Sequence, residues 1–187
     1  MANLSVTQPA NINQLNVVGF EVNIARLPNV EFFCQRVNVP GVILGETAES
    51  SPFMNNPLEG DTLTFESLTI GFILDEDMQN YMEIYNWLTA LGFPKNYEQF
   101  AALKRAEKYP ENTDSLYSDI NIMLLTNKNN PNYQVTFHDI FPTSLGSLNF
   151  DSAATTLEPM VIDATFNFRG QFEISKIGQY SSLYFQI

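Results

Sequence analysis

The sequence has very little of what enzymes use for chemistry: its 187 residues include one cysteine, Cys34, and one histidine, His138. A single cysteine excludes an internal disulfide and a multi-cysteine zinc site. A Ser-His-Asp triad would depend on His138, which ends an apolar segment where a packed or surface role is more common. No phosphate-binding loop, dinucleotide-binding glycine motif or HExxH motif occurs. The sequence therefore predicts a protein that is not an enzyme, with no catalytic residue, metal ion or cofactor.

Positive charge and long apolar runs are also scarce. Nine Lys and Arg residues stand against 21 Asp and Glu residues, which gives a formal net charge of −12. An acidic surface argues against binding to nucleic acids or to membranes, which requires basic residues. No apolar run approaches the roughly 18 residues of a transmembrane helix, and the N-terminus has no signal-peptide pattern. The 44% of hydrophobic residues still predicts a globular domain with a core.

Residues 60–92 change from a strand pattern to a helix pattern. Apolar residues alternate over 68–74, but upstream of residues 66–67 they have the opposite phase. This change predicts either a β-bulge or a strand that passes from one sheet to another. We expect Asp75 to cap a helix over about residues 76–91. Its buried face should contain Met78, Tyr81, Met82, Tyr85 and Leu88, widened at its borders by Ile84, Trp87 and Leu91. We expect a face this wide to bury the Trp87 ring.

Several other segments have the alternation of strands. Residues 19–27 and 30–39, joined at Pro28-Asn29, predict a β-hairpin. Residues 41–61 show no clear element, and a connection of this length is usually functional or mobile. We expect it to reach a neighbouring subunit. Further strands are expected over residues 119–125, 133–137 and 161–168, with a continuation at 172–174, and a second helix over 97–109.

Four of the nine basic residues lie in one segment after the predicted helix. Lys104 and Lys108, four residues apart, share a helix face, and Arg105 lies beside them. Clustered like charges do not stabilise a helix, which leaves either a solvated face or a docking surface for carboxylates. The candidate inter-subunit contacts are therefore Glu46, Glu49, Lys95, Lys104, Arg105 and Lys108.

Two segments carry a resemblance to a known family. The first, NPLEGDTLTFESLTIGFILDEDMQNYMEIYNWL, has an extended approach, Gly-Asp, a strand, an acidic helix start and a helix with Trp87. The second, DIFPTSLGSLNFDSAATTLEPMVIDATFNF, has an aromatic-Pro-Thr-Ser turn, a short strand over residues 147–150 and a closing strand. Over about residues 17–174 the chain resembles the tail-tube proteins of contractile-tailed bacteriophages. It departs from them in an extended N-terminal arm (1–16), an insertion (about 92–117) and a C-terminal tail (175–187).

The resemblance implies a mainly β fold with a flanking α-helix, in which two packed antiparallel sheets form a sandwich or barrel. It implies a structural virion protein, made in the host cytoplasm, of which six copies form a ring. The rings stack into a tail tube, and DNA passes through its lumen without specific binding. The implied partners are further copies of the chain, the tail sheath, and baseplate or tail-terminator proteins.

Two alternatives remain open. One is a baseplate tube-initiator or another tail-ring protein of the same fold. The other is a monomeric β-sandwich binding module, for example for a carbohydrate, with residues 41–61 and exposed tyrosines as its site. Self-association distinguishes the binding module from the ring proteins.

Overall fold

The computed structural model describes residues 12–50, 52–92, 95–105, 116–153, 155 and 158–177, with the side chains of 102–105 outside the description. Within these residues, the chain forms in order β1 (Phe20–Ile24), α1 (Pro28–Phe32), β2 (Cys34–Asn38), β3 (Val42–Ser50), β4 (Asn55–Phe65), β5 (Leu68–Ile73), α2 (Gln79–Gly92), α3 (Tyr97–Arg105), β6 (Ser118–Leu125), β7 (Pro131–Leu145), β8 (Val161–Asn167) and β9 (Glu173–Lys176).

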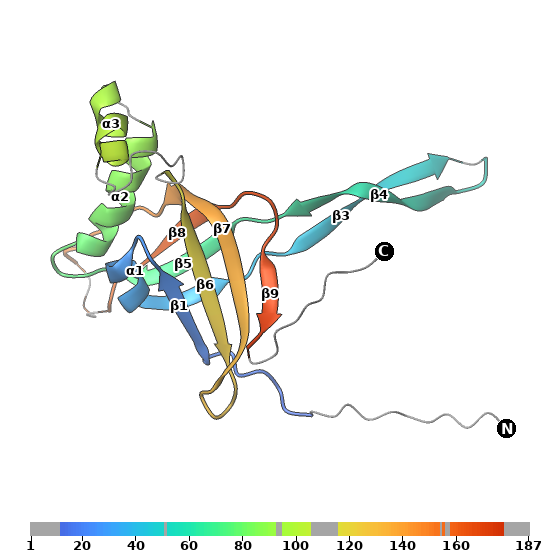
Figure 1. Cartoon of the computed structure of the whole chain (residues 1–187), viewed down its shortest axis with the longest axis horizontal. Helices are drawn as coiled ribbons and strands as arrows, with labels where there is room; N and C mark the ends of the chain where they lie inside the picture. Colours follow the sequence, from blue (N-terminus) through green and yellow to red (C-terminus); the bar gives the residue numbers. More distant parts are fainter. Residues whose placement is uncertain are drawn as a thin grey trace.

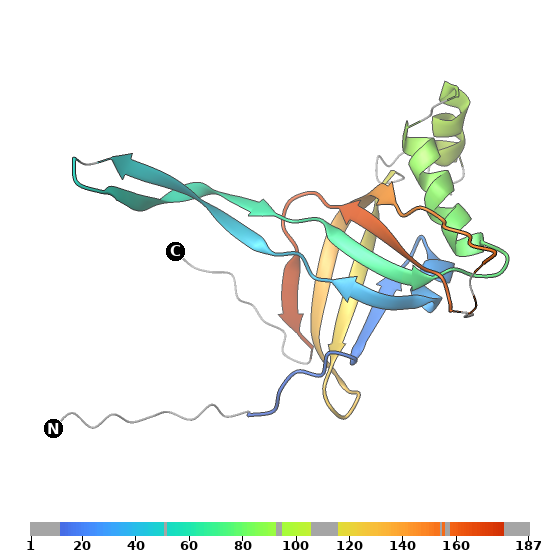
Figure 2. The ribbon, with the colours of Figure 1, turned by 180° about the vertical axis from the view of Figure 1, so that it is seen from behind.

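Two antiparallel layers enclose the core (Figures 1 and 2). One layer contains β1, β6, the first part of β7 and β9. The other contains the last part of β7 with β8, β5 and β2. A separate two-stranded ribbon of β3 and β4 projects from this body, and α2 and α3 lie at one end of it. The predicted fold class, mainly β with two antiparallel sheets and a flanking helix, is confirmed.

Strand β7 joins the two layers because it bends at Asp139. Asp139 has a φ of +50°, and the pairing of β7 with β6 changes register at this point. The Asp119 carboxylate accepts a hydrogen bond from the Asp139 backbone N–H at 3.1 Å. An irregularity of this kind bends a strand, so β7 leaves the first layer and continues in the second.

The predicted β-hairpin over residues 19–39 is wrong. β1 pairs with β6 and β2 pairs with β5, so the two strands are the outer edges of opposite layers. Between them, Pro28 is at the start of the helical turn α1, where its missing N–H costs no hydrogen bond. Leu27 and Val30 are buried in the core. The apolar residues that suggested continuous strand therefore belong to a packed helical turn.

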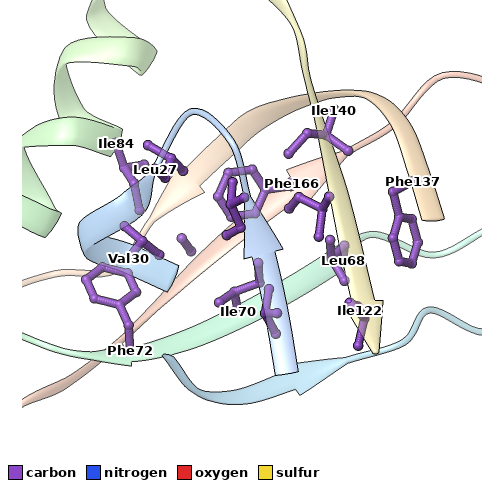
Figure 3. Close-up of a cluster of buried hydrophobic side chains, with 14 of the residues drawn as sticks. Leu27, Val30, Leu68, Ile70, Phe72, Ile84, Ile122, Phe137, Ile140 and Phe166 are labelled. Carbon is purple, nitrogen blue, oxygen red and sulfur yellow. The ribbon is translucent and has the colours of Figure 1, made fainter. Parts of the chain in front are cut away.

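The change of phase at residues 66–67 marks the passage from the ribbon to the body. β4 ends at Phe65 and pairs with β3, whereas β5 begins at Leu68 and pairs with β8 and β2. Of the two predicted explanations, the strand that passes from one sheet to another is confirmed. Figure 3 shows the consequence: Leu68, Ile70 and Phe72 of β5 point into the core.

One glycine of β5 permits an ion pair across the outside of its layer. Arg36 on β2 binds Asp163 on β8 through both carboxylate oxygens, at 2.7 and 2.6 Å. These hydrogen bonds raise the pKa of the Arg36 guanidinium. The pair passes over Gly71, where an added Cβ would lie 2.5 Å from the Arg36 side chain. Any larger residue would push the arginine off its partner.

Helix α2 begins later than predicted, and Asp75 does not cap it. The Met78 N–H donates to the Asp75 carbonyl at 2.9 Å, which closes a turn over residues 75–78 before the helix starts. The buried Asn80 side chain donates to the Ile73 carbonyl at 2.7 Å and accepts from the Asp75 N–H at 3.3 Å. A buried amide thus ties the helix start to the end of β5, and the acidic run stays in the turn.

The packed face of α2 is rotated from the predicted one. Met82 and Tyr85, expected to be buried, are 43% and 48% exposed. Ile84 and Trp87, expected at the border, are buried. Apolar residues of α2 occupy several of its faces, so the periodicity of the sequence alone does not identify which face is buried. Contact with α1 and β7 selects it instead, and the expected burial of Trp87 is confirmed.

Other expectations have mixed outcomes. Residues 41–61, expected to lack regular structure, contain all of β3 and the first part of β4. Residues 147–150 do not form the expected strand. The second helix is described as far as Arg105, so its predicted continuation to 109 lies outside the described residues. The same holds for residues 1–11 of the expected N-terminal arm and 178–187 of the expected tail.

Candidate functional site

The β3–β4 ribbon forms an arm that extends away from the body (Figure 1). Its strands pair antiparallel from Val42 opposite Phe65 to Ser50 opposite Asn55. Nearly all of its described side chains are exposed, on both faces. A two-stranded ribbon of this kind is only marginally stable in water by itself. The arm is therefore the part of the chain that would gain most from contact with another molecule.

Two local features control the shape and pairing of the arm. The register shifts near Gly45, which lies so close to Gly60 that a Cβ on Gly60 would be 2.5 Å from the Gly45 carbonyl oxygen. Glycine is therefore required at position 60. Pro57 in β4 lacks the N–H that an added strand would need, which limits uncontrolled pairing at an exposed edge.

The arm is acidic. Residues 42–65 contain Glu46, Glu49, Glu59 and Asp61 and no lysine or arginine. Glu46 and Glu59 are direct cross-strand partners, and like charges in that position destabilise a ribbon. A surface that brought cations to the arm would relieve this repulsion.

The arm also exposes apolar side chains at both ends. Near the body, Val42, Ile43 and Leu44 are about half exposed, between 50% and 55%. At the far end, Phe53 is 97% exposed. Contiguous exposed apolar residues mark surfaces that bind other proteins or ligands. The arm therefore combines carboxylates with uncovered apolar contacts.

Contacts at the base set the direction of the arm. Phe65 packs edge-to-face on Phe168 and Phe172, with ring centroids 6.0 and 5.7 Å apart. The Glu66 N–H donates to the Gly41 carbonyl at 3.1 Å, and the Glu66 carboxylate accepts from the Gly41 N–H at 3.3 Å. Both strands are thus held where they leave the body, so the subunit itself orients the arm.

A groove of about 810 Å³ lies beside this base. Its walls come from the end of β4, the C-terminal end of α2, the residue before β6, the last part of β7 and the end of β8 with the segment after it. The lining residues are 63–66, 88, 91–92, 117, 141–142 and 167–170. The Arg169 guanidinium lies 4.2 Å from the centroid of the Tyr117 ring and donates to the hydroxyl of the same residue. Tyr117 packs edge-to-face on Phe141. The groove thus has aromatic and aliphatic walls and one cation. We call it the base groove.

The described residues among the six predicted contacts lie in two separate parts of the fold, the arm and the segment of α3. Glu46 and Glu49 lie on β3 in the arm, whereas Lys95 precedes α3. Lys104 and Arg105 belong to the last turn of α3, but their side chains lie outside the described part of the chain, as does all of Lys108. The arm and α3 point in different directions (Figure 1). An ion pair between them would have to join two copies, and it stays a prediction.

The other side chains that could take part in chemistry, such as those of Cys34 and His138, lie in surroundings that are typical of structural residues. Burial raises the pKa of the Cys34 thiol to about 11, and burial also raises the pKa of Glu83, which accepts a hydrogen bond from Asn29. His138 Nδ1 lies 3.4 Å from Asp119 Oδ2 at the exposed bend of β7. Among the described residues, no group of three or more His, Cys, Asp and Glu side chains is placed to hold a metal ion. In the same part of the chain, no helix has the length and hydrophobicity to cross a membrane.

Solved structures share this fold, although no protein-family model and no curated protein matches the sequence. A chain of the anti-feeding prophage cap, described as a tube-terminating cap, aligns with a TM-score of 0.57 at 14% identity, covering 94% of this chain and 99% of that one. A chain of the six-fold symmetrised anti-feeding prophage baseplate aligns with a TM-score of 0.54 at 12% identity, covering 86% and 93%. A chain of the sheath–tube complex of an extracellular contractile injection system, PVC in its extended state, gives 0.51 at 15% identity, covering 88% and 93%.

These likenesses define the class of the fold. The chain has the fold of components of contractile injection systems, and the alignments extend over nearly the whole of each neighbour. At 12–15% identity they show the fold alone.

Proposed function

We propose that this chain is a structural subunit of the tube of a contractile injection particle, and that six copies form a ring that stacks on others. One observation carries the proposal: an arm exposed on both faces extends from a closed body. The shared fold with cap, baseplate and sheath–tube chains supports it. A variant of this proposal is that the chain forms a single specialised ring at the baseplate or cap instead of the repeating part of the tube.

The particle that we propose is the contractile tail of a bacteriophage, with the chain located in the virion. Its partners would be its own copies, the sheath, and baseplate or terminator proteins, and it would perform no catalysis. DNA would pass through the lumen. The net charge of −12 supports a lumen through which DNA passes without binding. Because charges act over only about 8 Å at physiological salt, acidic walls would not steer DNA along the axis but would keep phosphates from adhering on contact.

The purified wild-type protein is expected to form six-fold rings or stacked tubes. The physical reason is that association would cover apolar arm residues that are now exposed to water. Negative-stain electron microscopy together with light scattering over a range of concentrations measures this. A protein that remains monomeric at every concentration, with no ring in the microscope, would overturn the proposal in favour of a monomeric binding module.

The charge-pairing prediction has its own test. Reversing Lys104 and Arg105 to glutamate is expected to weaken assembly while leaving the subunit folded, because each lost exposed pair contributes about 0.2–1 kcal/mol and the ring repeats each pair. Raising the salt concentration should weaken wild-type assembly in the same way. The charge-conserving exchange Lys104→Arg with Arg105→Lys is the control. If the glutamate variant assembles as readily as the control at every salt concentration, the basic segment is a solvated face.

A further inference from the structure

The tip of the arm presents one aromatic ring to solvent. Phe53 is 97% exposed, and it follows Pro52 at the turn between β3 and β4. Nothing in β3 or β4 covers this ring, and the strand residues nearest to it are the polar Ser50, Asn55 and Asn56. An exposed phenylalanine at the end of a projecting ribbon, here followed by the exposed Met54, has the form of an anchor that enters a pocket on a partner.

The base groove has the chemistry that such an anchor requires. Leu88 and Leu91 of α2, Pro142 of β7 and the aromatic rings of its walls supply apolar surface. Its cation, Arg169, is paired with the ring and hydroxyl of Tyr117 rather than with a carboxylate. Its carboxylate, Glu66, already accepts the Gly41 N–H. The groove therefore offers apolar walls and a cation that is available to a second partner.

The tip and the groove complement each other in charge as well as in polarity. Glu49 on β3 precedes the tip by a few residues and faces Asn56 across the ribbon. The arm has no lysine or arginine of its own. An arm that brought Phe53 into the groove would carry Glu49 toward the rim, where Arg169 lies. Arginine prefers such a carboxylate partner to a neutral hydroxyl.

A subunit cannot place its own tip in its own groove. β3 has nine residues, and a strand rises about 3.3 Å per residue, so the tip lies about 30 Å from the base. The Phe65 and Glu66 contacts hold the base in one direction, and Figure 2 shows the arm extended away from the body. The groove lies at the base, so its occupant has to come from a second chain.

We propose that Phe53 at the arm tip of one copy inserts into the base groove of a second copy, with Glu49 close to Arg169. This inference rests on the proposed function, because it requires self-association. The tip and the groove are different surfaces, so the contact is head-to-tail. Contacts of this type repeat from copy to copy and generate closed rings or continuous stacks.

The first experiment removes the anchor. Phe53→Ala is expected to raise the concentration needed for half-maximal assembly about tenfold or more, since it removes the phenyl ring that would be buried in the groove. Phe150→Ala is the matched control, because Phe150 is also largely exposed (76%) but lies outside the arm and the groove. Light scattering measures both. Equal assembly of the two variants would overturn the proposal.

The second experiment fills the groove. Gly92 lines it, and a Cβ at this position would meet no heavy atom within 4 Å. Gly92→Trp therefore adds a bulky ring at the groove from a position whose Cβ has open space, and it should block assembly as Phe53→Ala does. Asn86→Trp, on an exposed position of the same helix outside the groove, is the control. Unchanged melting temperatures identify both variants as folded, and normal assembly by Gly92→Trp would overturn the proposal.

The third experiment locates the contact directly. In a Cys34→Ala background, a protein with Met54→Cys, which keeps the Phe53 ring beside an exposed position, is mixed with one carrying Gly92→Cys and oxidised. A disulfide-linked dimer formed by the mixture, in excess of the linked dimers that each protein forms alone, is expected. Wild-type rings with no such cross-link would overturn the tip-in-groove contact and leave the proposed function standing. Absence of wild-type assembly would overturn the proposed function, and this inference with it.

Discussion

Removal of the arm is expected to abolish assembly and leave a folded, monomeric body. The change replaces residues 44–63 with Asn-Gly, which joins the paired residues Ile43 and Thr64 by a two-residue turn. No residue of the buried core cluster lies in the deleted segment. The Phe65 and Glu66 contacts at the base remain. The body should therefore keep its melting temperature within a few degrees.

Size-exclusion chromatography with light scattering, and circular dichroism during heating, measure the two results separately. The wild-type protein at the same concentration is the reference for assembly. Rings or tubes formed by the armless protein would show that subunits associate through the body alone. A molten armless protein would contradict the description of the arm as an element outside the core.

Trp87→Ala is expected to lower the free energy of unfolding by about 3–5 kcal/mol, the usual cost of truncating a buried aromatic residue to alanine. Trp87 is 2% exposed, and its indole N–H donates to the Leu116 carbonyl at 3.1 Å. Its ring contacts Phe166, and the Arg26 guanidinium lies 4.7 Å from its centroid. The change therefore leaves a cavity and an unpaired carbonyl at the junction of α2 with the body.

Denaturant titration of the armless monomer measures this without interference from assembly. Each kcal/mol corresponds to about 2–4 °C for a chain of this size. Tyr85→Ala, on the exposed side of the same helix, is the control and should cost far less. Trp87→Phe separates packing from the hydrogen bond, since it keeps much of the ring. If Trp87→Ala and Tyr85→Ala cost the same, the helix face is misassigned.

The sequence predicted the body of the fold better than its extremities. Strand alternation over 119–125, 133–137 and 161–168 located β6, β7 and β8, because these strands have one face in the core and period-2 burial. The phase change at residues 66–67 located the passage between sheets for the same reason. Where a segment faces water on both sides, as in β3, burial imposes no pattern. The arm was therefore mistaken for an irregular connection.

The base groove could not have been predicted from the sequence. It is built by residues far apart in the chain, such as Leu63, Leu91 and Arg169, whose proximity depends on the sheet topology. Alternation also failed to distinguish a hairpin from two edge strands at residues 19–39, because pairing partners are a property of the whole sheet. Glu46 and Glu49 lie on β3 in the arm, and their role as contacts stays a prediction; nothing local in the sequence indicates that Glu46 opposes Glu59.

The strand pairing also determines the order in which strands can pair while the chain is being synthesised. β3 and β4 are joined by a short local connection. By contrast, Phe20 pairs with Leu124 and Leu68 pairs with Phe166, so both need residues that are synthesised much later. A hairpin forms within about 1–10 μs, but a ribosome adds only about 5–20 residues per second. All residues of the arm are therefore synthesised several seconds before the segment around Arg169 leaves the ribosome. In the proposed tip-in-groove contact, a nascent chain would offer a tip but no groove, so a half-made chain could not receive another.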